Sequence, residues 1–296
     1  MRILLTGGNG QVGWELRRVL GGLGEVISPD REELDLSRPE GIGPRVREIR
    51  PGLIINAAAY TAVDRAEEEP GLAMAVNGEA PGILAEEAKK IGASLIHYST
   101  DYVFDGENKT TPYREDDPPN PQNVYGETKL AGERAVQEAG GAYLILRTGW
   151  VYSLRRKNFL RTIQRLAGER EELKIVNDQF GSPTWSRTIA EATRTLLDRT
   201  VKAGPDHPAV FPAEAVGIYH LTCAGQTTWY DFTRAILDCP DSGHRPRVIP
   251  IPTSEFPTPA TRPRYSVLSN EKIKRVFGIE PPSWEEALKR CLRDVS

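Results

Sequence analysis

The chain has 296 residues, three cysteines and a formal net charge of −3, with a pI near 5.9. This length allows one large domain or two smaller ones, with a substantial core. The weak negative charge disfavours nucleic acid or an anionic membrane as a partner. No apolar run approaches the roughly 18 residues of a membrane span.

The cysteines suggest a reducing compartment. Cys223, Cys239 and Cys291 are widely spaced and form no C-x-x-C pattern, which argues against a disulfide framework and a structural zinc site. The apolar start of the chain is too short for the hydrophobic region of a signal peptide. We therefore expect a soluble, cytoplasmic protein.

The N-terminal residues predict a dinucleotide-binding unit. An apolar run at residues 2–6 predicts a strand and residues 14–20 predict an amphipathic helix, with Gly7, Gly10 and Gly13 between them. Glycines permit a tight turn and close approach of a ligand to the backbone, while N–H groups at the start of the helix can bind a pyrophosphate. The spacing differs from G-x-G-x-x-G, and a simple turn is the alternative.

Residues 25–31 predict a second strand, which ends in Asp30 and Arg31. An acidic side chain there can bind the adenosine ribose 2′-hydroxyl of NAD, whereas an arginine can accommodate the 2′-phosphate of NADP. Because the two side chains favour opposite cofactors, we expect the protein to use both NADH and NADPH. A solvated pair at the end of the strand is the alternative.

Strands and helices alternate through the first half of the chain. Residues 53–59 predict a parallel strand buried on both faces, followed by a loop at residues 61–64. Helices are predicted at residues 72–77 and 83–91, and further strands at 93–98 and 144–147. The pattern indicates an α/β fold of the Rossmann type, a doubly wound parallel sheet over residues 1–150 that binds NAD(P).

The alternation weakens after residue 150. We expect residues 151–296 to form mainly a smaller, C-terminal substrate-binding lobe, with some segments returning to the first domain. The predicted elements are a helix at residues 158–169, a strand at 173–176, a turn-rich loop at 178–184, an irregular proline-rich segment at 246–263 and a helix that follows a capping box at 283–286.

The residues that point to chemistry begin where the strand at 93–98 ends. The strand leads into Ser99-Thr100-Asp101-Tyr102, the place where a doubly wound sheet presents its catalytic groups. Residues 123–138 predict a helix on which Tyr125 and Lys129 share one face, one turn apart. A hydroxyl, a phenol and a lysine arranged in this way can reduce a carbonyl.

In this arrangement Tyr125 can act as a general acid while Thr100 hydrogen-bonds the same carbonyl oxygen. A lysine ammonium about 4 Å from the phenol favours the phenolate by roughly 1 to 4 kcal/mol, which lowers the pKa of Tyr125 by about one to three units. A solvated pair or a packing tyrosine is the alternative at this spacing.

Six motifs in the same order resemble those of the extended short-chain dehydrogenase/reductase family over nearly the whole chain. They are Gly7 to Gly13, Asn56 to Asp64, Ser99 to Phe104, Tyr125-Gly126-x-Thr128-Lys129, Asp178-Gln179-x-Gly181-x-Pro183-Thr184 and Thr258-Pro259-x-x-Arg262-Pro263. Within the family, the chain is most similar to reductases of dTDP-linked 4-keto-6-deoxy sugars. The resemblance implies NAD(P)H-dependent reduction of the C4 ketone of dTDP-4-dehydro-6-deoxy-L-mannose to dTDP-L-rhamnose, by a monomer or homodimer.

The resemblance also implies roles for individual residues. Thr100, Tyr125 and Lys129 would be catalytic, and Lys129 would also bind the nicotinamide ribose. The cofactor-binding residues would be Gly7, Gly10, Gln11, Val12, Gly13, Asp30, Arg31, Asp35, Leu36, Ala59, Tyr60, Thr61, Tyr125 and Lys129. The residues that bind the dTDP-sugar would be Val63, Thr100, Asp101, Tyr102, Trp150 and Arg262.

Two of these roles have structural alternatives. Trp150 would offer an apolar face to the deoxy-sugar, but it could be a core tryptophan. Arg262 would bind the substrate diphosphate, but it could be a surface arginine.

The chain departs from the family at two places. Residues 153–157, Ser-Leu-Arg-Arg-Lys, stand where the family has a small loop with glycine. We expect a solvated turn, with help in holding the nucleotide diphosphate as the alternative. Some members are dimers bridged by magnesium through glutamates, of which only Glu15 has a match here, so we assign no metal site.

Three other functions remain open. One is reduction of another 4-keto-6-deoxy sugar nucleotide. A second is dehydration or epimerisation on the same fold, although sugar-nucleotide 4,6-dehydratases follow Thr-Asp with a catalytic glutamate, where this chain has Tyr102. The third is a non-catalytic role like that of the regulatory β subunit of methionine adenosyltransferase, which resembles the family and binds the dinucleotide.

Overall fold

The computed structural model describes residues 1–107, 109–200, 211–238 and 245–294. At its centre is a six-stranded parallel sheet with the strand order β10-β5-β4-β3-β1-β2. The strands are β1 (Arg2–Thr6), β2 (Glu25–Ile27), β3 (Leu53–Asn56), β4 (Ser94–Thr100), β5 (Tyr143–Thr148) and β10 (Gly217–His220). The prediction of a Rossmann-type doubly wound sheet is therefore confirmed.

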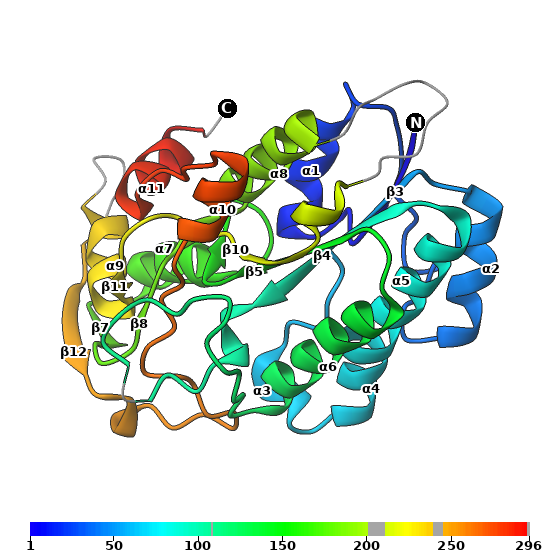
Figure 1. The fold of residues 1–296 in the computed structure, drawn as a ribbon. Helices are drawn as coiled ribbons and strands as arrows, with labels where there is room; N and C mark the ends of the chain where they lie inside the picture. The colour runs from blue at the N-terminus through cyan, green and yellow to red at the C-terminus, as the bar shows by residue number, and fades with distance from the viewer. Residues whose placement is uncertain (108, 201–210, 239–244, 295–296) are drawn as a thin grey trace.

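Helices cover both faces of the sheet, which explains the continuously apolar strands. Figure 1 shows α1 (Gln11–Leu20) and α8 (Ser186–Thr200) on one face, and α2 (Pro39–Ile49), α5 (Ala80–Ile91) and α6 (Val124–Ala139) on the other. One apolar cluster fills each interface. Leu5, Ile55 and Ile96 belong to the first cluster, whereas Leu4, Ile54 and Leu95 belong to the second.

Several predicted boundaries change in the structure. The second strand ends at Ile27 rather than at residue 31, because Pro29 and an Asp30 turn follow it. The predicted loop at residues 61–64 is wrong in its second half, where α3 (Val63–Ala66) begins. The two predicted helices at residues 72–91 form one helical run: α4 (Pro70–Met74), a π-helical turn (Ala75–Glu79) and α5.

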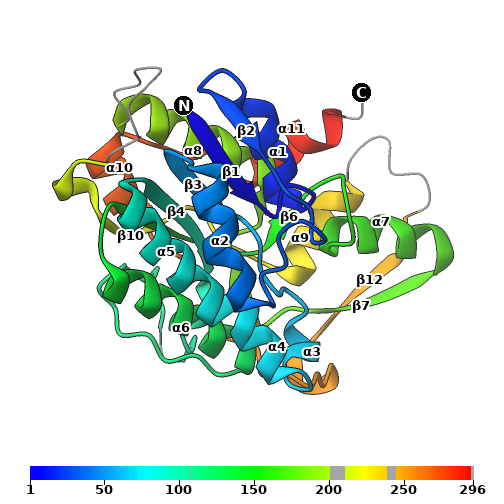
Figure 2. The ribbon, with the colours of Figure 1, turned by 90° about the vertical axis from the view of Figure 1, so that its right-hand side faces the viewer.

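A second group of elements packs at the side of the sheet, where Figure 2 shows β7 and β12 near α7 and α9. Its elements are β6 (Val151–Tyr152), α7 (Phe159–Glu169), β7 (Glu172–Val176), β8 (Phe180–Gly181), β9 (Thr184–Trp185), β11 (Thr227–Thr228), α9 (Trp229–Leu237), β12 (Arg247–Ile251) and α11 (Trp284–Arg293). A separate apolar cluster, which includes Tyr152, Phe232 and Trp284, forms the core of this group.

Two predictions for this group are wrong in part. The loop at residues 178–184 contains β8 and the start of β9. The proline-rich segment contains β12, which pairs in parallel with β7 and places Pro250 opposite Ile175. A proline fits there because β12 lies at the edge of a two-stranded sheet, where one side of the strand needs no ladder donor.

Parts of the second half of the chain lie with the parallel sheet. Strand β10 extends its edge, α8 packs against α1, and α10 (Glu271–Phe277) adds Ile273 and Phe277 to the first apolar cluster. Cys223 and Cys291 are buried free thiols, and Cys239 lies outside the described residues. Within the described ranges, no helix is both long and apolar enough to cross a membrane.

Close packing of α6 against the π-helical turn gives a stability prediction. A Cβ at Gly132 would lie 2.1 Å from the Asn77 carbonyl oxygen, whereas a Cβ at the helical Gly168 would have no heavy atom within 4 Å. We expect Gly132→Ala to lower the free energy of unfolding by ~1–3 kcal/mol through overpacking. Gly168→Ala should raise it by about 0.5 kcal/mol through helix propensity. Urea unfolding of both variants measures the difference, and equal effects would contradict this description of the packing.

Candidate active site

The glycine turn after β1 packs directly on the end of β3. Gly7 has a φ of 69°. The Gly10 amide closes the turn by donating a 2.8 Å hydrogen bond to the Gly7 carbonyl. A Cβ at Gly7 would lie 2.6 Å from the Ala58 nitrogen, and a Cβ at Gly13 would lie 2.1 Å from the Gly7 oxygen. Larger residues at Gly7 and Gly13 would therefore displace the backbone.

The start of α1 leaves its donors available. Gly10 is the N-cap, and no side chain of the described residues caps the first turn, in which Gln11 and Val12 lie. Free N–H groups and the positive end of the helix dipole suit an anion. The turn and the helix start therefore fit a dinucleotide diphosphate.

Residues 153–158 bind this turn from the second group of elements. The side-chain oxygen of Gln11 accepts hydrogen bonds from Ser153 Oγ at 2.8 Å and from Asn158 Nδ2 at 2.9 Å. The Arg155 guanidinium lies 3.7 Å from the centroid of the Trp14 ring, and Arg156 Nε donates to the Asn9 carbonyl at 2.8 Å. Arg155, Arg156 and Lys157 are exposed, as expected of a solvated turn, whereas Ser153 is buried and fastens the segment to the glycine turn.

The acidic loop after β2 is held by its own hydrogen bonds. Asp30 Oδ1 accepts from the amides of Glu32 and Glu33 at 2.9 and 3.1 Å. Arg31 lies 3.5 Å from Asp35, whose pKa is lowered chiefly by a hydrogen bond from Ser37. The predicted Leu36 is buried in the second apolar cluster. Asp30, Arg31 and Asp35 thus lie together at the end of β2.

The loop after β3 carries Ala59, Tyr60 and Thr61. Asn77, from the π-helical turn, accepts a hydrogen bond from the Tyr60 amide at 2.8 Å and donates to the Tyr60 carbonyl at 3.0 Å. Isolated π-helical turns often mark functional positions. Asn77 therefore fixes the backbone of the loop on which the inner half of a cofactor is expected to lie.

The predicted catalytic residues meet at the ends of β4 and α6. Asn123 caps α6 by accepting from the Gly126 amide at 2.8 Å, which places Tyr125 and Lys129 on the helix face toward β4. The Tyr125 hydroxyl lies near the Thr100 hydroxyl, whose own hydrogen goes to Asp101 Oδ1 at 3.1 Å. Lys129 is 1% exposed, and its Nζ donates to the Tyr98 carbonyl at 2.6 Å.

The expected lowering of the Tyr125 pKa is wrong for this structure. Burial raises the pKa of Tyr125 to about 12, and the charge of Asp101 adds to the shift, against the hydrogen bond from Thr100. The Lys129 ammonium faces the Tyr98 carbonyl and His97 instead, and burial lowers the pKa of Lys129 to about 8. At neutral pH Tyr125 thus keeps its proton.

Asp101 and Tyr102 complete this end of β4. Asp101 is 3% exposed, and its Oδ1 accepts from Thr100 Oγ1 at 3.1 Å. A Cβ at Gly149 would lie 2.6 Å from the Asp101 carboxylate, so that residue must be small. The Tyr102 ring meets the Tyr125 ring edge to face, with centroids 5.7 Å apart.

Trp150 follows Gly149 with a left-handed φ of 49°. Its ring stacks on Trp229 with centroids 3.4 Å apart and an interplanar angle of 2°, and it excludes a side chain at Gly181. Trp229 Nε1 donates to Gln179 at 3.2 Å. One face of Trp150 is therefore taken by a second tryptophan, and Gly181 packs against the Nε1 side of the ring, so that Trp150 is only partly exposed.

Arg262 reaches this region from the opposite end of the chain. It donates to Asp64 Oδ2 at 2.8 Å and lies near the Tyr102 hydroxyl. A hollow of about 290 Å³ lies beside it, lined in part by Val63, Asp64 and Pro259. All six predicted substrate-binding residues thus occupy the region between the end of the sheet and the second group of elements.

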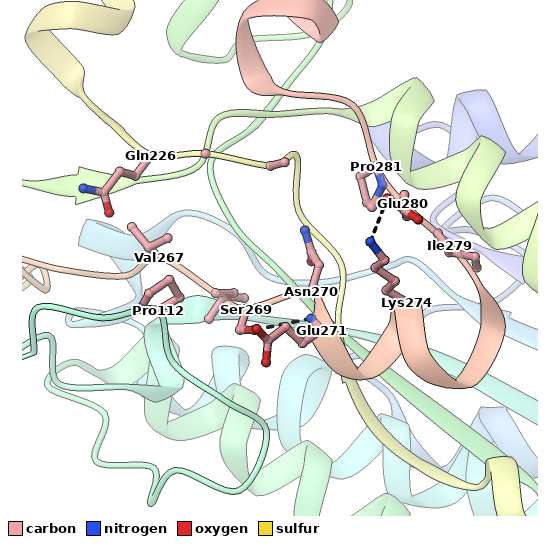
Figure 3. Close-up of a pocket in the computed structure, with 13 residues that line it drawn as sticks. Pro112, Gln226, Val267, Ser269, Asn270, Glu271, Lys274, Ile279, Glu280 and Pro281 are labelled. Carbon is pink, nitrogen blue, oxygen red and sulfur yellow. Dashed lines mark hydrogen bonds and ion pairs between the residues drawn. The ribbon is translucent and has the colours of Figure 1, made fainter.

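A cavity of about 370 Å³ lies elsewhere, between α10 and the segments at residues 224–226 and 267–270. Figure 3 shows its lining, in which Lys274 and Glu280 form an ion pair of 3.0 Å. None of the predicted site residues lines it. We place the active site at the glycine turn and β4, because groups for acid–base chemistry converge there.

Glu15 lies on α1 and is 6% exposed. Its carboxylate pairs with Arg187 at 3.1 Å and with Arg18 at 3.3 Å, while Arg187 also pairs with Asp294. Two arginines thus balance this carboxylate. The described residues contain no group of three or more His, Cys, Asp or Glu side chains able to hold a metal ion.

Sequence reasoning missed three polar residues of the site: Asn77, Asn56 and His97. Asn56 and His97 are fully buried within apolar strands. Buried polar side chains cost stability unless they are paired. A polar residue inside an apolar run was therefore the sequence signal that could have indicated these two residues.

The glycine turn and the group of Thr100, Tyr125 and Lys129 fit the site of an NAD(P)-dependent short-chain oxidoreductase. Comparison with known proteins narrows this class. The family model described as the RmlD substrate binding domain matches residues 1–296, and the chain belongs to this family.

Relatives and solved structures agree with the assignment. A dTDP-4-dehydrorhamnose reductase of Burkholderia thailandensis is 52% identical, over 100% of this chain and 99% of the relative. The structure of a Clostridium acetobutylicum dTDP-4-dehydrorhamnose reductase is similar, with a TM-score of 0.90 and 39% identity over 99% of both chains. That of the Bacillus anthracis enzyme, in complex with NADP, has a TM-score of 0.89 and 35% identity over 99% of both chains.

The buried Asp101 carboxylate gives a pH prediction. Burial raises its pKa from 3.8 to about 6, so the folded chain binds this proton more tightly than the unfolded chain. The associated stabilisation is present below pH 4 and is lost as the pH rises through 6, to a limit of ~3 kcal/mol. We expect the stability of Asp101→Asn relative to the parent to improve by ~1–3 kcal/mol between pH 4 and pH 8. Denaturant unfolding across this range provides the measurement.

The matched control is Asp116→Asn, at an exposed carboxylate. The difference in unfolding free energy between this variant and the parent should stay constant with pH. A constant difference for Asp101→Asn as well would show that the Asp101 carboxylate is not destabilised by burial.

Proposed function

We propose that this chain catalyses the reaction for which its dTDP-4-dehydrorhamnose reductase relatives are named: NAD(P)H-dependent reduction of the C4 ketone of dTDP-4-dehydro-6-deoxy-L-mannose to dTDP-L-rhamnose. The main support is the Thr100–Tyr125 hydroxyl pair at the end of β4, beside a glycine turn that fits a dinucleotide. The 52% identity over the whole chain supports the particular substrate.

The proposed chemistry assigns a separate task to each catalytic side chain. Thr100 and Tyr125 donate hydrogen bonds to the ketone oxygen, which orients the carbonyl and stabilises the charge that develops on it. Bound NAD(P)H supplies the hydride. Tyr125 then transfers its proton to the oxygen, a role for which its raised pKa keeps it protonated at neutral pH. The Lys129 cation, one turn along α6, stabilises the resulting phenolate and binds the cofactor ribose.

The cofactor residues surround the glycine turn. Gly7 and Gly13 let the backbone approach the diphosphate, and Gly10, Gln11 and Val12 contribute the start of α1. Asp30, Arg31, Asp35 and Leu36 take the adenosine end, while Ala59, Tyr60 and Thr61 take the nicotinamide end. Residues 1–150 thus form the main cofactor domain.

The substrate residues lie on the other side of Tyr125. Trp150 offers the exposed part of its ring to the deoxy-sugar. Val63, Asp101 and Tyr102 enclose the sugar, and Arg262 binds the diphosphate. Residues 151–296 supply most of the enclosing lobe. We place the reaction in the cytoplasm, where a monomer or homodimer acts on the dTDP-sugar.

The proton-donor role predicts a specific kinetic defect. Tyr125→Phe removes the acidic hydroxyl and keeps the ring, so kcat should fall by about a hundredfold or more with nearly unchanged NADPH affinity. The matched variant Tyr102→Phe, which alters the neighbouring ring, should retain far more turnover. Steady-state kinetics and NADPH fluorescence titration provide the two readouts. A Tyr125→Phe enzyme with normal kcat would place the donor elsewhere.

Cofactor selectivity is a separate prediction. Because Asp30 and Arg31 lie together at the end of β2, we expect kcat/KM for NADH and NADPH to agree within about a hundredfold. Nicotinamide absorbance would be followed with enzymatically prepared dTDP-4-dehydrorhamnose, and the product identified as dTDP-L-rhamnose. A larger preference for one cofactor would contradict the shared role of the pair. Tight NADPH binding without oxidation would reject this substrate.

A further inference from the structure

A polar row crosses the apolar face of the sheet below α6. Thr6 of β1 lies opposite Asn56 of β3, and Asn56 lies opposite His97 of β4, in the parallel register. All three side chains are at most 3% exposed. They share the sheet face on which Leu4, Ile54 and Leu95 pack in the second apolar cluster. Such a row costs stability unless its members satisfy one another.

Hydrogen bonds join the row into a chain that ends at Lys129. Thr6 Oγ1 donates to Asn56 Oδ1 at 2.6 Å, and the Asn56 amide nitrogen lies 3.1 Å from His97 Nδ1. The other ring nitrogen of His97, Nε2, lies 3.3 Å from Lys129 Nζ. The row therefore begins at the residue before the glycine turn and ends at the lysine of the active site.

Each member of the row can both donate and accept a hydrogen bond. When the His97 ring carries its proton on Nε2, it can donate to the amine form of Lys129. When the proton is on Nδ1, Nε2 accepts a hydrogen bond from the ammonium form of Lys129. The Asn56 side-chain amide can then flip, so that its oxygen accepts from His97 Nδ1. The neutral ring required for both arrangements is favoured, because burial and the Lys129 charge hold the pKa of His97 well below its usual value.

The other groups that face Lys129 are already engaged. Glu133 lies one turn further along α6, and its charge acts to raise the pKa of Lys129. Its oxygens bind Ser99 and Arg147, which come from β4 and β5. Among the described residues, His97 is the side chain that hydrogen-bonds the lysine nitrogen, and the Tyr98 carbonyl is its backbone partner.

We propose that Thr6, Asn56 and His97 form a positioning row that holds Lys129 Nζ beside the end of β4 in both of its protonation states. The row acts through Lys129 and does not touch the substrate. It also ties the lysine to the strand that leads into the glycine turn. The inference rests on the proposed reductase function for its turnover readout, whereas cofactor affinity tests it without any sugar substrate.

Two substitutions at His97 separate positioning from simple core filling. His97→Gln can place an amide where Nε2 stands, and so keeps a donor and an acceptor next to Lys129. His97→Asn can replace Nδ1 only, which preserves the contact with Asn56 and removes the contact with Lys129. Both variants bury a carboxamide. If His97 had a purely structural role, the losses of kcat and NADPH affinity in the two variants would therefore follow their losses of thermal stability.

We expect His97→Asn to lower kcat about tenfold or more and to weaken NADPH binding several-fold, with the KM for the sugar nucleotide changed by less than about threefold. His97→Gln should recover most of both losses. The control is His220→Asn, at a second fully buried histidine whose Nδ1 lies 3.1 Å from the Tyr113 carbonyl. It should change stability without weakening NADPH binding.

The measurements are steady-state kinetics, NADPH titration by fluorescence and thermal unfolding, on the full chain. Equal defects in His97→Asn and His97→Gln, or a folded His97→Asn protein with parental kcat and NADPH affinity, would overturn the positioning row. If the parent protein bound NADPH but did not reduce the sugar nucleotide, the proposed function would fail. The affinities of the three variants would still decide the role of the row.

A double substitution tests whether the row acts as one unit. Thr6→Val removes the hydroxyl at nearly constant volume and should give a smaller loss of NADPH affinity. In the His97→Asn background this second loss should disappear, because the link to Lys129 is already broken. Fully additive losses would show that Thr6 acts independently of His97 and would overturn the row as a unit.

Discussion

The site depends on how α6 is fastened to the sheet, and a buried ion pair contributes to this. Glu133 and Arg147, with side chains 1% and 3% exposed, meet at 2.6 Å, and Ser99 donates to the same carboxylate. These hydrogen bonds join α6 to β4 and β5. The position of α6 along the two strands is therefore set by directional polar contacts as well as by apolar packing. Lys129 and Tyr125 lie about one and two turns before Glu133 on the same face. The ion pair thus helps to set the position of α6 along β4, on which the approach of Tyr125 to Thr100 depends.

The same region carries groups that weaken the fold. Asp101 is a buried carboxylate whose Oδ2 has no partner among the described residues, and Lys129 is a nearly fully buried cation. Both would be replaced by apolar residues if stability alone mattered. Their presence at the end of β4 and on α6, near the Thr100 and Tyr125 hydroxyl groups, fits the proposed carbonyl reduction. Strain at a non-glycine residue, Trp150, lies in the same region.

Local patterns predicted most of the fold and the central part of the site. Continuous apolar runs identified the strands, and the helical composition of residues 123–138 identified α6. The pattern failed where tertiary partners decided the structure. Strand β12 forms because β7 offers it a pairing edge, despite Pro250. The Tyr125 pKa depends on burial and on Asp101, neither of which a four-residue spacing reveals.

The sequence also could not predict which side chains become neighbours across adjacent strands. Thr6, Asn56 and His97 are separated by 40 or more residues along the chain, and they become neighbours through the register of three strands. Trp229 likewise meets Trp150 only through the packing of α9. Each residue taken alone is an ordinary member of its strand or helix. Their roles emerge once the sheet order is known.

The most direct test of the account is a crystal structure with NADPH and dTDP-L-rhamnose bound. The account predicts the C4 oxygen of the sugar within ~3 Å of both Thr100 Oγ1 and the Tyr125 hydroxyl, with the nicotinamide on the glycine-turn side. A sugar bound with that oxygen against Asp101 or Arg262, away from Tyr125, would contradict the assignment of Tyr125 as the proton donor.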